Sequence, residues 1–145
     1  MISVFRRNRI FKGNYPAFSP YDRLALKMIV RSIHKPFKRI IEIGSWAGNG
    51  STAAIIEELH KGEGLLYCVD TWKGTRNVKR HQDMVREYDM FGTFMHNVAK
   101  VRGQDFVKPL VMSSQDAASV MSDNVFDLVF IDADHAYDET LKDIR

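Results

Sequence analysis

The chain has 145 residues, of which 45% are hydrophobic, 11% aromatic and 27% charged, a composition typical of one ordinary soluble globular domain. Its nine glycines and four prolines are too few for a collagen-like or low-complexity chain. No apolar run approaches the roughly 20 residues that span a bilayer, and the hydrophobic stretch within residues 1–11 is too short for a signal peptide. We therefore expect a soluble, cytoplasmic protein with no membrane partner.

The net charge of +3 conceals an uneven distribution. Residues 1–40 carry ten basic side chains and one acidic, a net +9, whereas residues 41–145 carry eleven basic and seventeen acidic, a net −6. The basic residues that begin the chain could contact nucleic acid or an acidic membrane surface, or they could form a solvated, partly disordered arm. Because no RNA-binding signature follows them, we expect an arm over residues 1–20, a domain over residues 21–145 and no nucleic-acid partner.

The single cysteine, Cys68, lies in an apolar run, so no intrachain disulfide can form. We expect a buried structural thiol rather than a reactive one, and neither redox nor zinc chemistry.

The expected elements alternate between helix and strand. An amphipathic pattern predicts a first helix from Pro20 to about Ser32, and Pro36 stops it. The elements that follow are predicted as a strand over 39–43, a helix over 51–60, a strand over 65–70, a loop over 71–80, a helical stretch over 81–101 with a break near Gly92 left open, a strand over 108–112, a helix over 114–121, a strand over 125–132 and a last helix from about Tyr137.

This alternation predicts an α/β fold with a doubly wound parallel sheet, Rossmann-like, with strand order 3-2-1-4 and ligands at the carboxyl ends of the strands. The last predicted helix stops after about two turns at Arg145 with no capping residue. The last strand would leave an uncovered sheet edge. We therefore expect a truncated chain that lacks the last strands of a seven-stranded fold; a small complete domain with a frayed final helix is the alternative.

The residues suited to chemistry gather at strand ends, first in the turn after the first strand. From Glu42 this turn reads EIGSWAGNGS. Gly44 and Gly48 would let the backbone turn sharply and approach a ligand, and the next helix offers free amides to a carboxylate or phosphate. The GxxxGxG spacing matches neither the dinucleotide motif nor the P-loop, and a glycine turn without a ligand is the alternative.

Asp70 ends the second predicted strand, 20 residues after Gly50. A carboxylate at this place can accept two hydrogen bonds from a ribose diol, which favours an adenosine-containing cofactor; an aspartate that caps the following turn is the alternative. Trp72 could cover the adenosine, line a substrate entrance or pack the loop.

The glycine loop followed by a strand-end acid resembles the class I S-adenosylmethionine-dependent methyltransferases. Ser113 to Asp116 is similar to the Ser-Gln-Asp segment of catechol O-methyltransferases, whose Ser and Gln contact the adenine. Phe130 to His135 resembles the FVDADK segment of caffeoyl-CoA-type O-methyltransferases, in which the first Asp binds a divalent metal and the residue three positions on is the catalytic base. His135 in place of Lys, with the segment VDTWKG from Val69, is similar to the macrocin-type sugar and antibiotic O-methyltransferases.

The resemblance spans residues 37–145 and implies S-adenosylmethionine-dependent O-methyl transfer to a small hydroxylated acceptor, sugar-like or phenolic. It implies Asp132 as a Mg²⁺ ligand and His135 as the catalytic base. The cofactor contacts that it implies are Glu42, Gly44, Ser45, Trp46, Gly48, Ser51, Asp70, Thr71, Trp72, Ser114, Gln115 and Asp132.

The chemistry independently agrees with these roles, because a hydroxyl must lose its proton before its oxygen attacks the sulfonium methyl. A metal at Asp132 would make the hydroxyl more acidic, and an imidazole at position 135 could accept the proton near neutral pH. One aspartate does not complete a Mg²⁺ site, so we expect metal only in a longer enzyme. The alternative is a polar turn in which Asp134 caps a helix.

The four other histidines have no ligand-spaced partner, and we expect them on the surface or in packing: His34, His60, His81 and His96. Two other function classes stay open: an NAD-dependent oxidoreductase, which the spacing from Gly50 to Asp70 permits, and a non-catalytic nucleotide-binding module. A homo-oligomer also stays open.

Overall fold

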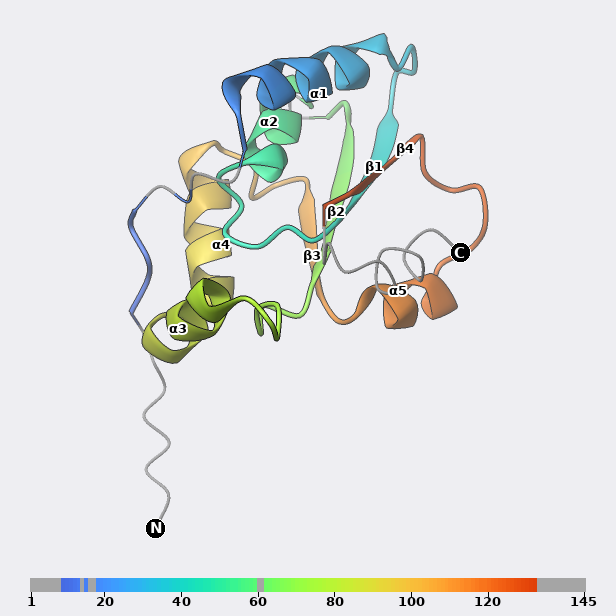
Figure 1. Ribbon diagram of the computed structural model, residues 1–145. Helices are drawn as coiled ribbons and strands as arrows, with labels where there is room; N and C mark the ends of the chain where they lie inside the picture. Colours follow the sequence, from blue (N-terminus) through green and yellow to red (C-terminus); the bar gives the residue numbers. More distant parts are fainter. Residues whose placement is uncertain (1–8, 14, 16–17, 60–61, 133–145) are drawn as a thin grey trace.

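The computed structural model describes residues 9–13, 15, 18–59 and 62–132. It confirms the α/β fold, with four parallel strands in the order β3-β2-β1-β4 (Figure 1). In chain order the elements are α1 (Pro20–Ser32), β1 (Lys38–Ile43), α2 (Ser51–Glu58), β2 (Gly64–Asp70), α3 (Lys79–Glu87), α4 (Met90–Lys100), β3 (Val107–Val111), α5 (Ser114–Val120) and β4 (Leu128–Ile131). None of these helices is long and apolar enough to cross a membrane.

The strand order places a switch of direction between β1 and β4. The chain adds β2 and then β3 on one side of β1, and β4 pairs with the other side, where Ile43 stands opposite Ile131. Ligands of open parallel sheets bind outside the carboxyl ends of the strands at such a point. The fold therefore predicts a ligand site among the residues that follow β1 and β4.

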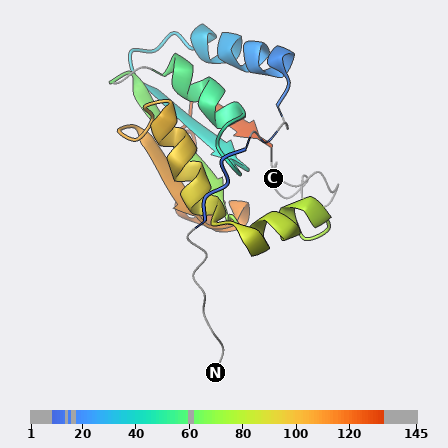
Figure 2. The same cartoon turned by 90° about the vertical axis from the view of Figure 1, so that its left-hand side faces the viewer.

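Helices cover both faces of the sheet (Figure 2). α2 and α4 pack on one face, and α1 lies outside α2. On the other face, Ala117 of α5 packs against Ile41, Ile43 and Val69.

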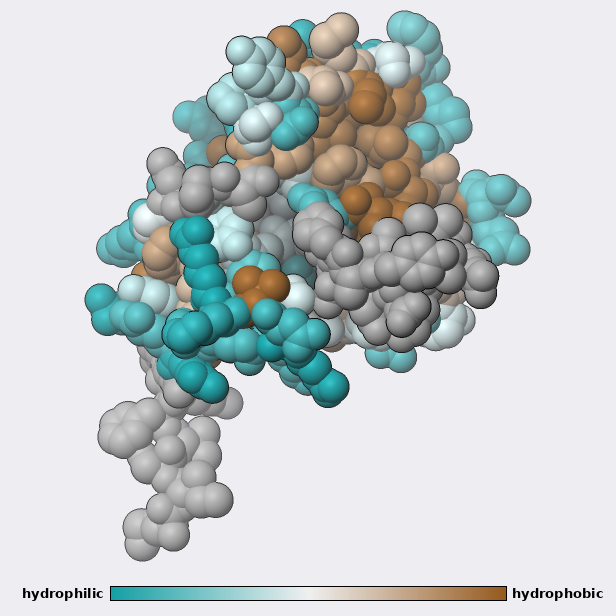
Figure 3. Space-filling view, viewed as in Figure 1, coloured by the Kyte–Doolittle hydropathy of each residue, from teal (hydrophilic) through white to brown (hydrophobic). Residues whose placement is uncertain are grey.

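The edge of β4 away from β1 pairs with no other described strand. Val129 of β4 is 54% exposed, and the outer face of α1 adds Leu24, Met28 and Ile29, all exposed. Figure 3 shows an apolar area beside α1. The expected uncovered edge is therefore present within the described residues.

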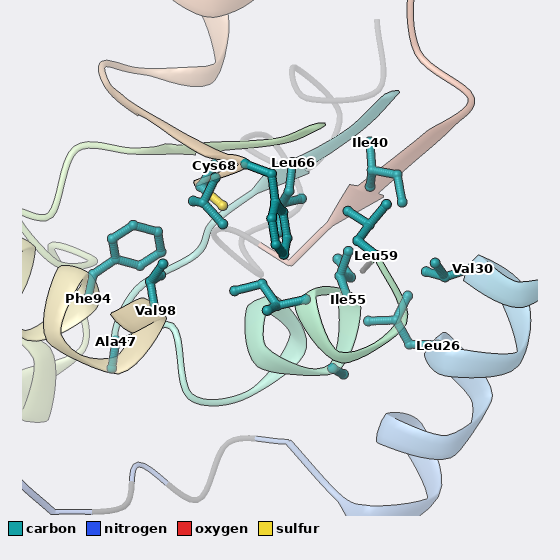
Figure 4. Packing of buried hydrophobic residues seen from close by; sticks show 14 of the residues in the cluster. Leu26, Val30, Ile40, Ala47, Ile55, Leu59, Leu66, Cys68, Phe94 and Val98 are labelled. Carbon is teal, nitrogen blue, oxygen red and sulfur yellow. The ribbon is translucent and has the colours of Figure 1, made fainter. Parts of the chain in front are cut away.

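The larger core cluster lies between the sheet and the helices α1, α2 and α4 (Figure 4). Ile40, Ile55, Leu59, Leu66 and Phe94 have no exposed surface. Each such side chain contributes about 1.5–3 kcal/mol on burial. The cluster also holds Cys68, which confirms the prediction of a buried thiol.

The described part of the predicted N-terminal arm packs against the domain. The amide of Phe11 donates to the Thr93 hydroxyl at 3.0 Å, and the Phe11 ring meets the Tyr88 ring edge-on at 5.2 Å. Phe11, Tyr15 and Phe18 all contact the larger core cluster. The expectation of a solvated arm is wrong for these residues, because their aromatic side chains bury apolar surface.

The helical stretch predicted over 81–101 is two helices, and the break left open near Gly92 is present at Tyr88 and Asp89. α3 ends at Glu87, and α4 begins after Asp89, whose side chain accepts a hydrogen bond from the Gly92 amide at 2.8 Å. An aspartate that caps a helix N-terminus in this way starts a new helix.

The fourth strand, β4, is shorter than the predicted span of 125–132, and it follows a turn in which Asn124 has a left-handed conformation. Pairing to β1 begins at Asp127, whose amide donates to Arg39 O at 2.7 Å. The Asp127 carboxylate accepts from the Arg39 amide at 2.8 Å and pairs with the Lys35 ammonium. These contacts fasten the start of β4 to the start of β1.

Asp127→Asn should lower the free energy of unfolding at neutral pH by about 1–2 kcal/mol, because a hydrogen bond to a charged group contributes about 1.5–3 kcal/mol and solvent around the exposed Lys35 side chain screens part of it. The Lys35 ammonium and the Arg39 amide lower the pKa of Asp127. Its contribution is therefore fully present above the ordinary pKa of about 3.9 and is lost as pH falls through the lowered value. Urea unfolding of variant and parent should differ at pH 7 and converge in acid.

Asp123→Asn is the matched control, because Asp123 is exposed in the same turn. Equal losses of stability in the two variants would contradict the role given to Asp127.

Candidate functional site

A pocket of about 330 Å³ lies at the carboxyl ends of β1 and β4, at the point where the strand order reverses. The loop between β1 and α2 forms one part of its lining, residues before α1 and around the start of α3 form another, and Asp132 follows β4. The lining residues are Tyr15, Phe18, Gly44, Ser45, Trp46, Ala47, Gly48, Asn49, Gly50, Ser51, Thr75, Val78, His81 and Asp132.

The loop from Gly44 to Gly50 needs unusual backbone conformations. Gly44 and Gly48 have φ of 91° and 74°, in the region where glycine carries no steric penalty. A Cβ at Gly48 would also lie 2.8 Å from the Phe94 ring of α4. Both glycines therefore serve the predicted sharp turn, and Gly48 also allows the close approach to α4; the predicted approach to a ligand stays a prediction.

Two tryptophans also adopt the left-handed backbone conformation, although their side chains make it unfavourable. Trp46 has φ of 43° and Trp72 has φ of 52°, a conformation that costs a non-glycine residue about 1–3 kcal/mol. The Asp70 carboxylate accepts a hydrogen bond from the Trp46 amide at 2.8 Å and from the Trp72 amide at 2.7 Å. The Trp72 indole N–H donates to Trp46 O at 2.7 Å. Asp70 thus joins the loops that follow β1 and β2.

Burial raises the pKa of Asp70, while the amides of Trp46 and Trp72 oppose the rise. The prediction that Asp70 caps the following turn and the prediction that it binds a ribose are compatible. The two carboxylate oxygens have about four acceptor positions; the Trp46 and Trp72 amides use one on each oxygen, and the Thr71 amide also donates to this carboxylate.

Glu42 of β1 holds the same loop through buried hydrogen bonds. It has no exposed surface, and its carboxylate accepts hydrogen bonds from the hydroxyls of Ser45, Ser51 and Thr52 at 2.5–2.7 Å. The Cys68 thiol lies 3.7 Å from the same group. Burial raises the pKa of Glu42, and the three hydroxyls oppose that rise.

Six of the predicted cofactor residues line the pocket, and six do not. Those in the lining are Gly44, Ser45, Trp46, Gly48, Ser51 and Asp132. Those outside it are Glu42, Asp70, Thr71, Trp72, Ser114 and Gln115. The prediction that Glu42 contacts the cofactor directly is wrong, because this side chain is fully enclosed and positions the loop instead.

Trp72 packs the loop rather than covering a ligand. It is 6% exposed, and its ring lies 4.9 Å from the rings of both Phe91 and Phe94. Of the three roles left open by the sequence, the structure supports packing.

Sequence reasoning missed the aromatic residues that stand over the loop. The Tyr15 hydroxyl lies 2.6 Å from His81 Nε2, and the His81 ring stacks on Trp46 at 4.5 Å. His81 therefore lines the pocket, and its expected role on the surface or in packing is incomplete. Only its place after a strand-end loop hinted at this position; Tyr15 gave no local signal.

Asp132 lies in the pocket, and its amide donates to Ile43 O at 2.8 Å. Within the described residues no three His, Cys, Asp or Glu side chains come together as a metal site. A single carboxylate does not satisfy the octahedral preference of Mg²⁺, so the described residues do not fit a magnesium site. Asp134 and His135 lie outside the described residues.

Glu42→Gln should remove part of the pH dependence of stability. Because the folded pKa of Glu42 is raised, its favourable contribution is present below the ordinary value of about 4.3 and is lost as pH rises through the raised value. The parent should therefore lose stability relative to Glu42→Gln over that interval, as measured by urea unfolding at a series of pH values. Parallel curves for the two proteins would refute the buried, titrating carboxyl.

Glu42→Ala is the informative companion, since it leaves three hydroxyls without their acceptor. Each unsatisfied buried group costs about 1–3 kcal/mol, so this variant should unfold at a clearly lower temperature than Glu42→Gln.

The matching structures share the fold. A crystal structure of the O-methyltransferase from Bacillus cereus in complex with S-adenosylhomocysteine aligns with a TM-score of 0.56 and 22% identity over 83% of this chain. The crystal structure of PH0851 aligns with a TM-score of 0.51 and 20% identity over 77% of this chain. The chain spans 48% of the first structure and 21% of the second.

No curated protein sequence matches the chain. A family model described as a methyltransferase domain matches residues 41–145, which include the glycine loop, Asp70 and Asp132. With the parallel sheet and the pocket at its switch point, this match shows that the chain belongs to the methyltransferase domain family.

Proposed function

We propose that the protein transfers a methyl group from S-adenosylmethionine to a hydroxyl of a small acceptor, sugar-like or phenolic. The observation that carries the proposal is the pocket at the switch point, lined by a glycine loop whose shape is fixed by Asp70 and Glu42. The O-methyltransferase from Bacillus cereus, similar in fold, has been solved with S-adenosylhomocysteine.

The start of α2 suits the methionine portion of the cofactor. Its N-cap, Gly50, provides no side-chain acceptor, and its first turn holds no acid. Helix N-terminal amides with these properties attract a carboxylate. Ser51 at this end also lines the pocket, so we assign the cofactor's amino-acid end to the region from Gly44 to Ser51.

Asp70 suits the ribose, because its two oxygens offer about four acceptor positions and the backbone amides of Trp46, Trp72 and Thr71 do not occupy all of them. We assign the adenine to the neighbourhood of Ser114 and Gln115, which begin α5 after β3. Thr71 follows Asp70 and is assigned to the same end of the cofactor.

In the proposed reaction the acceptor oxygen attacks the methyl carbon, the bond from that carbon to sulfur breaks, and neutral S-adenosylhomocysteine leaves. The hydroxyl proton passes to a base, which we assign to His135 from its place three residues after Asp132. A general base typically contributes about 10²–10⁴-fold. Asp132 lines the pocket and is assigned to orient the acceptor and cofactor.

Titration calorimetry with S-adenosylhomocysteine and, in parallel, with NAD tests the cofactor. We expect binding of the former only. Asp70→Ala should weaken that binding by about 10- to 100-fold, the equivalent of 1.5–3 kcal/mol for hydrogen bonds to a charged group.

Asp123→Ala, which removes an exposed carboxylate elsewhere, is the matched control and should bind as the parent does. Thermal unfolding of Asp70→Ala shows whether weaker binding comes from a disrupted loop, which lowers the melting temperature, or from the missing hydrogen bonds to the ribose alone, which do not. Binding of NAD alone would favour an oxidoreductase, and binding of neither would favour a module without this cofactor.

His135→Ala should lower kcat by about 10²-fold or more with any acceptor that the protein methylates, and should leave the affinity for S-adenosylhomocysteine nearly unchanged, because a base acts chiefly in the transition state. Steady-state turnover measures kcat, and calorimetry measures the affinity for S-adenosylhomocysteine. Unchanged kcat would remove His135 from the proposed mechanism.

A further inference from the structure

The segment from Thr71 to Gln82 borders the pocket and is strongly basic. Thr75, Val78 and His81 of this segment line the pocket. It carries no acidic residue and four cationic side chains, which we call the basic rim: Lys73, Arg76, Lys79 and Arg80. Figure 3 shows hydrophilic side chains gathered over α3 and the loop before it.

Most of the basic rim lacks a carboxylate partner. Lys79 pairs with Asp83, which also lies 3.8 Å from Arg86. Arg80 lies over the Tyr15 ring, 4.7 Å from its centre. Lys73 and Arg76 are exposed and form no ion pair with any described residue. Two full charges therefore flank Thr75, which lines the pocket, without a counter-ion from the described residues.

The loop that carries these charges is fastened to α3. The Gln82 side-chain amide donates to Thr75 O at 3.0 Å and lies 3.5 Å from Lys73 O. The Thr75 amide donates to His81 Nδ1 at 3.4 Å. The backbone on both sides of Gly74 is therefore held, which lowers the entropy cost of binding a ligand there.

The sign of the charge is also unusual for this place in the helix. α3 begins with Lys79 and Arg80, has no acid in its first turn, and its N-cap, Val78, supplies no side-chain acceptor. Cations at a helix N-terminus are unfavourable, whereas an anion there is stabilised. An anion bound at the basic rim would offset the repulsion between these cations and the positive end of the α3 dipole.

Charges of opposite sign lie on different segments that border the pocket. Among the described residues the lining contains one acidic residue, Asp132 after β4, and no Lys or Arg; the four cations lie outside the lining, on the segment before and within α3 that also carries Thr75, Val78 and His81. An anionic group is repelled by the carboxylate and attracted by the rim. A molecule with both a hydroxyl and an anionic group would therefore bind with the anion at the rim and the hydroxyl free to approach the deeper pocket.

We propose that the acceptor is anionic, and that Lys73 and Arg76 bind its carboxylate or phosphate beside Thr75. This inference rests on the proposed methyl transfer and specifies its substrate class. An Arg guanidinium can bind either anion through two parallel hydrogen bonds, and a Lys ammonium adds a point charge.

Calorimetry with two matched pairs of probes tests the proposal, both with and without saturating S-adenosylhomocysteine. The carboxylate pair is 3,4-dihydroxybenzoate against catechol, and the phosphate pair is glucose 6-phosphate against glucose. In at least one pair we expect the anion to bind about tenfold or more tightly than its neutral counterpart. The pair that shows the preference identifies the anion as carboxylate or phosphate.

The double variant Lys73→Ala, Arg76→Ala should lose that preference and keep the parent's affinity for S-adenosylhomocysteine. The control, Lys100→Ala with Lys108→Ala, removes the same charge from exposed positions on α4 and β3 and should keep the preference. Absence of an anion preference in both pairs, or an equal loss in both double variants, overturns the proposal.

Failure of the proposed function looks different, since the protein would then not bind S-adenosylhomocysteine at all, while the probe comparison without cofactor would still report on the rim. Tighter binding of a short RNA than of every small anion, abolished in Lys73→Ala, Arg76→Ala, would overturn the small-molecule assignment.

Discussion

The site depends on one carboxylate that joins two loops. Asp70 ends β2 and binds the amides of Trp46 and Trp72, and both tryptophans hold a left-handed backbone that is costly for residues with a side chain. Hydrogen bonds to a charged group, about 1.5–3 kcal/mol each, are large enough to offset that cost. Without Asp70 both loops lose the hydrogen bonds that offset this cost, and the pocket wall at Trp46 is weakened.

Buried and half-buried polar groups elsewhere support the same loop. Glu42 collects three hydroxyls beneath it, Asn97 of α4 donates to Ala47 O at 2.8 Å, and Arg23 of α1 reaches Gly50 O at 3.4 Å. Residues from three helices and two strands thus converge on seven residues of loop. Such a loop is arranged before a ligand arrives, which reduces the ordering cost that binding must overcome.

The sheet and much of the loop could be predicted from the sequence, because apolar strands, glycine spacing and strand-end acids are local signals. The strand order 3-2-1-4 is confirmed. The break near Gly92 is also a local signal, and Asp89 provides it. Local signals failed where partners come from distant segments, because Glu42 is enclosed by hydroxyls of α2 that meet it only in the folded chain. Tyr15 and His81, 66 positions apart, come together through packing that no motif records.

A crystal structure of the protein grown with saturating S-adenosylhomocysteine tests the central claim most directly. The account predicts the ligand's amino-acid end at the amides that begin α2 and its ribose hydroxyls within hydrogen-bond distance of Asp70, with the bonds from Asp70 to Trp46 and Trp72 unchanged. A ligand bound elsewhere, or a ribose that displaces Asp70 from the two tryptophan amides, would contradict it.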